Sequence, residues 1–160
     1  MGARASDSVR VRVAGVIPQA TGLVVVRHRQ GQRRYHLLPG GGVEHGETLE
    51  QALVREVREE TGLEIRLERP LFINDTIDPM GGRHLVNLTF LCTAVGGQLV
   101  PRPADVTIDG VELADITRLL TLDLRPAIAE QIAEAAAVGY RSEARYLGAI
   151  WTPETGRGAE

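Results

Sequence analysis

The chain has 160 residues, of which 43% are hydrophobic and 24% charged, and its formal net charge is −3. This composition is typical of one globular domain with a real core, and it excludes the disordered, fibrous and membrane-embedded classes. The net negative charge gives no electrostatic basis for general nucleic-acid binding, and no apolar run approaches the ~20 residues of a membrane helix.

The first third of the chain predicts strands, which we expect at 9–17, 22–27 and 35–38. In the first, valine alternates with arginine at the period of two that is typical of a half-buried strand, with Val9, Val11 and Val13 facing inward. The second is a continuous apolar run, which predicts a strand buried on both faces and joined to the first in one sheet. The third runs into the glycine-rich segment 39–42.

A helix is expected at 48–61, because Thr48 with Gln51 three residues later has the form of a capping box and Gly62 stands where helices stop. The later elements are expected as strands at 64–74, 84–94 and 107–114, a helix at 125–138 and a strand at 146–151. This order predicts an α/β fold with a mixed sheet between helices. We expect one domain over 9–152, with loose ends at 1–8 and 153–160.

The lone cysteine, Cys92, lies in an apolar strand segment and is expected to be an inert core thiol. The polar N-terminal segment has no apolar stretch of the kind that signal peptides carry, so a cytoplasmic location is expected. No membrane partner is expected.

The helix at 48–61 carries carboxylates where its inward-facing stripe should be apolar. The stripe begins with Leu49, Ala52 and Leu53 and continues with Glu56, Glu59 and Glu60. Residues three and four apart share one helix face, so these like charges repel each other unless a cation lies among them. Hard carboxylate oxygens without histidine or cysteine favour Mg²⁺, Mn²⁺ or Ca²⁺. The alternative is a solvated helix face with intrahelical arginine pairs.

Glycines directly before this helix, Gly40, Gly41, Gly42 and Gly46, favour the metal-site interpretation, because they let backbone groups approach phosphate or metal closely. Gly41 is followed after five residues by Glu47 and after seven more by the sequence REVREETGL at 55–63. This resembles the Nudix box, G-x5-E-x7-R-E-U-x-E-E-x-G-U with U aliphatic, at every defined position.

The resemblance implies a Nudix-type α/β/α sandwich that hydrolyses a nucleoside diphosphate linked to another group. It implies that Glu56, Glu59, Glu60 and the Gly40 carbonyl hold Mg²⁺ or Mn²⁺, with Glu59 or Glu60 also a candidate general base. Arg55 would orient a glutamate. Position 36 is often aromatic in this family, whereas here it is His36.

Outside the box, Glu112 is a second candidate base, with a solvent-facing strand residue as the alternative. Arg27, His28 and Gly41 are candidate substrate-binding residues. The substrate would be a small nucleotide: a nucleoside triphosphate, ADP-ribose, a nucleotide sugar or a dinucleoside polyphosphate. No stable nucleic-acid partner is expected, and a homodimer is one expected assembly by the same resemblance.

Two other functions compete with this one. A non-catalytic domain that senses a nucleotide would not need three mutually repelling carboxylates. An isomerase of prenyl diphosphates on a related fold would need a catalytic cysteine in the pocket, which Cys92 does not supply if it is buried.

Overall fold

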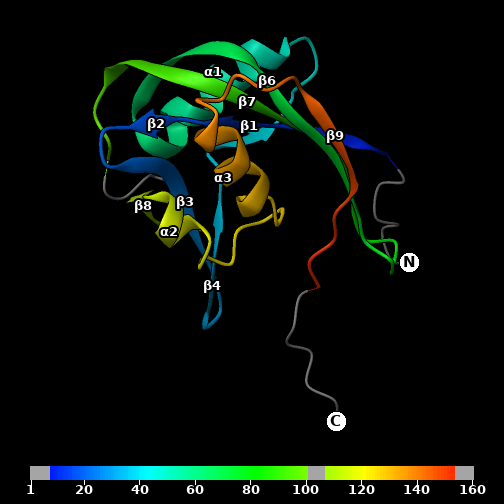
Figure 1. Ribbon diagram of the computed structural model, residues 1–160. Helices are drawn as coiled ribbons and strands as arrows, with labels where there is room; N and C mark the ends of the chain where they lie inside the picture. Colours follow the sequence, from blue (N-terminus) through cyan, green and yellow to red (C-terminus); the bar gives the residue numbers. More distant parts are fainter. Residues whose placement is uncertain (1–7, 101–106, 154–160) are drawn as a thin grey trace.

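The computed structural model describes residues 8–100 and 107–153 (Figure 1). Its elements are β1 (Arg10–Val16), β2 (Pro18–Gln19), β3 (Gly22–Gln30), β4 (Arg33–Leu37), β5 (Gly40–Gly42), α1 (Leu49–Thr61), β6 (Leu63–Ile77), β7 (His84–Gly97), β8 (Ile108–Ala114), α2 (Ile116–Leu119), α3 (Ala129–Ala137) and β9 (Arg145–Ala149). Apart from residues 8 and 153, the expected loose ends lie outside the described residues. Within them, no helix combines the length and the apolar character that a bilayer crossing requires.

The strands form two sheets. The larger one has the order β5-β1-β7-β6-β9 and is mixed, because β1 pairs with β7 and β6 with β9 in parallel while the other pairs are antiparallel. The smaller one consists of β2, β3 and β4, with β8 on the other edge of β3. The expected α/β fold with a mixed sheet is confirmed.

The expectation that the first two strands share a sheet is wrong. Both edges of β1 are occupied, by β5 and β7, and both edges of β3 are occupied, by β4 and β8. Neither strand therefore has a free edge for the other, and they belong to different sheets.

Two apolar clusters pack on the two faces of β1, because side chains alternate along a strand. Val13 joins the cluster that contains Ala52, Leu53 and Val57 of α1. Ala14 and Val16 join the cluster that contains Ile132 and Ala135 of α3. Figure 1 accordingly shows α1 behind the large sheet and α3 in front of it.

The outward end of β1 differs from expectation. Val9 and Val11 are 52% and 37% exposed, so only Val13 of the three valines reaches a core. Val11 instead borders a surface cavity together with Arg10 and Arg12.

Helix α1 begins and ends where its sequence indicates. Thr48 and Gln51 form the reciprocal capping box, with Gln51 N donating to Thr48 Oγ1 over 3.1 Å. Gly62 closes the helix in the left-handed conformation, with φ of 77°. A side chain at Gly62 would also meet the Gln98 carbonyl oxygen at 2.4 Å, so glycine is required there twice over.

The last helix starts later than predicted, at Ala129 rather than within the turn of Pro126. The chain before it is held extended against β4: His36 N donates to the Asp123 carbonyl over 2.8 Å, and Arg125 N donates to the His36 carbonyl over 2.9 Å. Backbone groups committed to a neighbouring strand cannot also begin a helix.

Candidate active site

The glycine-rich segment before α1 is a short strand rather than an open loop. In β5, Gly41 pairs with Val13 and Gly40 with Ala14 of β1. A side chain at Gly40 would place its Cβ 2.0 Å from the Val13 carbonyl oxygen, which no residue tolerates. Glycine is therefore what allows this strand to lie so close to β1.

Two helix carboxylates approach this glycine strand. Gly40 N donates to Glu60 Oε2 over 2.9 Å. A Cβ on Gly41 would lie 2.4 Å from the carboxyl carbon of Glu56. The missing side chains thus create the space in which Glu56 and Glu60 meet the backbone of β5.

Arg55 ties the helix to the segment before it. Its guanidinium donates to Glu47 Oε1 over 2.6 Å, to Glu56 Oε1 over 2.7 Å and to the Gly42 carbonyl over 3.3 Å. Hydrogen bonds from Arg55 hold the pKa of Glu47 down at about 2, and the two carboxylates raise the pKa of Arg55. One arginine therefore sets the positions of both Glu47 and Glu56.

Arg12 is a site residue that the sequence pattern did not single out, because it looked like the solvent face of a half-buried strand. It lies partly buried beside Gly42 in register and donates to the Leu38 carbonyl over 3.1 Å. Burial lowers the pKa of Arg12, while the negative charges of Glu60 and Glu56 oppose that shift. The signal that could have identified Arg12 is an arginine on a strand that pairs with the glycine strand.

Glu59 is oriented differently from the other two glutamates. Its side chain is 62% exposed, and its Oε2 lies 3.7 Å from Nη1 of Arg55. Within residues 8–100 and 107–153, no three acidic, histidine or cysteine side chains converge as a metal-ligand cluster. The donor set still suits a hard divalent cation, since Glu56 and Glu60 are placed at the glycine strand and the exposed Glu59 is one helical turn from Glu56.

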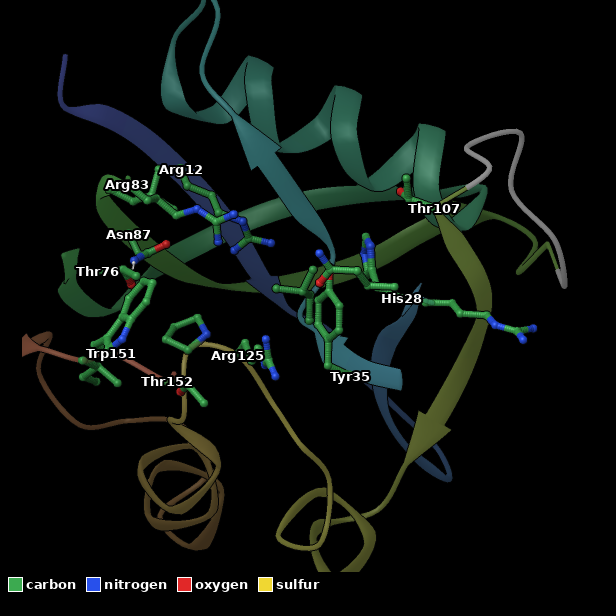
Figure 2. A pocket seen from close by; sticks show the side chains of 16 residues that line it. Arg12, His28, Tyr35, Thr76, Arg83, Asn87, Thr107, Arg125, Trp151 and Thr152 are labelled. Atoms are coloured by element: carbon green, nitrogen blue, oxygen red, sulfur yellow. Dashed lines mark hydrogen bonds between the residues drawn. The ribbon is translucent and has the colours of Figure 1, made fainter. Parts of the chain in front are cut away.

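A cavity of about 430 Å³ opens between the two sheets, and it is lined by Arg12, whose charge interacts with those of Glu60 and Glu56 (Figure 2). On one wall, the rings of His28 and Tyr35 stack with centroids 5.4 Å apart, and the Arg125 guanidinium lies 4.7 Å from the Tyr35 centroid. Trp151 and Arg12 line other parts of the cavity. An aromatic and cationic pocket of this kind suits a planar, anionic ligand such as a nucleotide.

His36, in contrast, does not line this cavity. It is 7% exposed, and its Nε2 lies 3.5 Å from Glu112 Oε2. Burial lowers the pKa of His36, an effect that the negative charge of Glu112 opposes. The aromatic surface in the cavity comes from the neighbouring Tyr35 instead.

Two of the sequence candidates meet each other away from the glutamates of α1. Arg27 pairs with Asp109 over 3.1 Å and with Glu112 over 3.5 Å. Glu112 lies in register with Val25, whose side chain packs in the apolar cluster that contains residues of α3, called here the α3 cluster. The neighbouring Val111 packs against the apolar cluster that contains residues of α1, called here the α1 cluster. The structure therefore turns Glu112 to the face of β8 that points away from α1. Of the outlying candidates, His28 is the one that lines the cavity.

Comparison with known proteins agrees with this geometry. The model of the NUDIX domain matches residues 8–135. A NUDIX hydrolase structure from Nitrosomonas europaea superposes with a TM-score of 0.70 at 27% identity, covering 82% of this chain and 90% of that one.

Curated relatives are similar over a shorter span. An ADP-ribose pyrophosphatase of Methanocaldococcus jannaschii is 33% identical over 90 residues, which are 56% of this chain and 53% of that protein. An NAD-capped RNA hydrolase, NudC, of Stutzerimonas stutzeri is 36% identical over 94 residues, which are 59% of this chain and 32% of that protein. The chain thus spans about half or less of the length of these relatives.

Proposed function

The chain belongs to the Nudix family, and from that membership we propose that it hydrolyses a diphosphate bond in a nucleoside diphosphate linked to another group. The observation that carries the proposal is the approach of Glu56 and Glu60 to Gly41 and Gly40, beside a cavity that suits a nucleotide. The relative from Methanocaldococcus jannaschii, named an ADP-ribose pyrophosphatase, supports the same reaction class.

We propose that Glu56, Glu59, Glu60 and the Gly40 carbonyl hold Mg²⁺ or Mn²⁺. Clustered carboxylates are hard ligands, and their mutual repulsion favours a bound cation. A bound divalent ion supplies charge neutralisation on the diphosphate and lowers the pKa of a coordinated water.

The protein groups have separate tasks in this proposal. Arg55 holds Glu56 in position through a hydrogen bond, so that the carboxylate oxygens of Glu56 are available at the glycine strand. Glu59 is exposed and its ion pair with Arg55 is long at 3.7 Å, which suits the general base that removes a proton from water. Arg12 balances the charge of Glu56 and Glu60 from the β1 side.

The test is a screen with Mg²⁺ across nucleoside triphosphates, ADP-ribose, nucleotide sugars and dinucleoside polyphosphates, with the cleavage products separated by chromatography. Replacing Glu56, Glu59 or Glu60 by glutamine is expected to lower kcat on the best substrate by at least about 100-fold. Glu130→Gln, an exposed glutamate in the first turn of α3, is the matched control and is expected to leave kcat unchanged.

Full activity of the three α1 variants would show that this helix is not the catalytic element. Failure of the wild-type protein to cleave any of these substrates, combined with nucleotide binding, would favour the non-catalytic sensing domain instead.

A further inference from the structure

Positive charge gathers around the proposed substrate cavity although the chain as a whole is negative. A second cavity of about 490 Å³ adjoins the first, and the two share Arg12, Arg83 and Leu85. The arginines that line one or both cavities are Arg10, Arg12, Arg29, Arg83 and Arg125. Among the described residues, no aspartate or glutamate lines either cavity.

Among the described residues, no carboxylate neutralises the charge of Arg10 or Arg83. Arg125 has an ion pair with Asp123 at 3.0 Å, and Arg12 faces the charges of Glu60 and Glu56. In the described part of the chain, neither Arg10 nor Arg83 has a carboxylate within ion-pair distance. Their charges are therefore available to an anionic ligand.

These arginines lie on the side of the cavity that leads to the glycine strand. Gly42 lines the second cavity, and its carbonyl accepts a hydrogen bond from Arg55. Arg10 lies in register with Leu85, which brings it to the segment that carries Arg83. Figure 2 shows Arg12 and Arg83 together on one side of the first cavity, with Tyr35 and Arg125 on the other.

We propose that the substrate carries a phosphate group beyond the diphosphate that is cut, and that this additional phosphate binds at Arg83 and Arg10. The proposal rests on the proposed function, because it places the scissile diphosphate at α1. A neutral sugar in the second cavity would leave two arginines without a counter-charge, whereas a phosphate accepts charge-assisted hydrogen bonds from both. Arg12, which lines both cavities, would lie between the two phosphate positions.

The additional phosphate can be a monoester on a ribose or part of a longer polyphosphate chain, and paired substrates distinguish these sources. ADP-ribose is compared with ADP-ribose 2′-phosphate, and diadenosine diphosphate with diadenosine tetraphosphate. In at least one pair, kcat/KM with Mg²⁺ is expected to be about tenfold or more higher for the member with more phosphate.

Arg83→Gln is expected to bring that ratio close to one. Arg66→Gln is the matched control, since Arg66 is an exposed arginine on β6 outside both cavities, and it should leave the ratio at its wild-type value. Ratios near one for both pairs in the wild-type protein, or an unchanged ratio in Arg83→Gln, would overturn the proposal.

Binding gives a readout that does not depend on turnover. Trp151 is the only tryptophan of the chain and lines the first cavity, so its fluorescence reports occupancy. Titration of the same four compounds in EDTA is expected to give an about tenfold lower Kd for the member with more phosphate in the preferred pair. Equal affinities within both pairs contradict the additional phosphate site, whereas a clear difference without hydrolysis contradicts only the proposed reaction.

Discussion

Gly41 leaves no room for a side chain beside the carboxylate of Glu56. Gly41 has no positive φ, so an alanine there is disfavoured by contact with Glu56 and not by its own backbone. Because the Cβ would lie 2.4 Å from the carboxyl carbon, Gly41→Ala must push Glu56 away from β5. If Glu56 has its proposed role, a displacement of about 1 Å costs about 100-fold in rate, and we expect that loss in kcat/KM.

Gly96→Ala provides the control for this variant. A Cβ at Gly96 would meet the flexible, exposed Glu64 side chain, whose nearest atom is its terminal oxygen at 3.3 Å. Steady-state kinetics should show wild-type rates for this control, and urea unfolding should show folded protein in both variants. Wild-type rates in Gly41→Ala would mean that the position of Glu56 against β5 does not matter for activity.

At the scale of the element, the ion pair between Arg55 and Glu47 joins α1 to the loop that precedes it. The stabilisation that this ion pair provides should depend on pH. Hydrogen bonds from Arg55 lower the pKa of Glu47 from its ordinary value of 4.5 to about 2 in the folded protein, so the ion pair stabilises the fold fully above about pH 4.5. This stabilisation is lost as the pH falls through about 2. Arg55→Gln should therefore lower the free energy of unfolding at pH 7, and its difference from wild type should shrink between pH 4.5 and pH 2.

Urea unfolding at pH 7, 4 and 2.5 measures this difference. Arg141→Gln removes an arginine that donates to the Val138 carbonyl and is paired with no carboxylate in the described residues, so its effect should be the same at all three pH values. A difference for Arg55→Gln that stays constant with pH would show that Glu47 does not gain its low pKa from Arg55.

The elements that sequence could predict are those that depend on neighbouring residues. The limits of α1 follow from Thr48, Gln51 and Gly62, all within or beside the helix. The strand β5 could not be predicted in this way, because three glycines have no strand propensity and form a strand only through pairing with β1. The start of α3 was likewise decided by hydrogen bonds to His36, far away in the sequence.

At the scale of the whole molecule, the candidate site also contains some residues that local sequence predicts and others that only the fold brings together. The box glutamates could be found from spacing alone, since they share one helix face. The residues that line the cavity could not be found from spacing, and these include Arg12, Tyr35, Arg83 and Trp151. They come together only when the two sheets enclose the cavity, and the strand patterns do not encode how far apart the sheets lie. Both sheets contribute to both apolar clusters, since β1 and β3 each place side chains in the α1 cluster and in the α3 cluster, so the cavity between the sheets depends on both clusters.

The rate at which a thiol reagent labels Cys92 can show whether the two apolar clusters unfold together. It is 1% exposed in the α1 cluster, which confirms the expected buried thiol, and burial raises its pKa to about 12. Because the thiolate is the reactive form, a thiol reagent at pH 8 should react slowly with the folded protein and rapidly in urea. Val57→Ala in the α1 cluster and Ile132→Ala in the α3 cluster each create a cavity that destabilises the core by about 2 kcal/mol or more.

If the domain unfolds as one cooperative unit, both variants should speed labelling of Cys92 in proportion to their loss of stability, about 30-fold for 2 kcal/mol. Labelling with a chromogenic disulfide reagent, beside urea unfolding of each variant, measures the two quantities independently. Faster labelling in Val57→Ala alone would show instead that the α1 side opens without the α3 side. The carboxylates of α1 would then lie on a separately mobile half of the molecule, and the geometry at Gly40 and Gly41 would hold only while that half is closed.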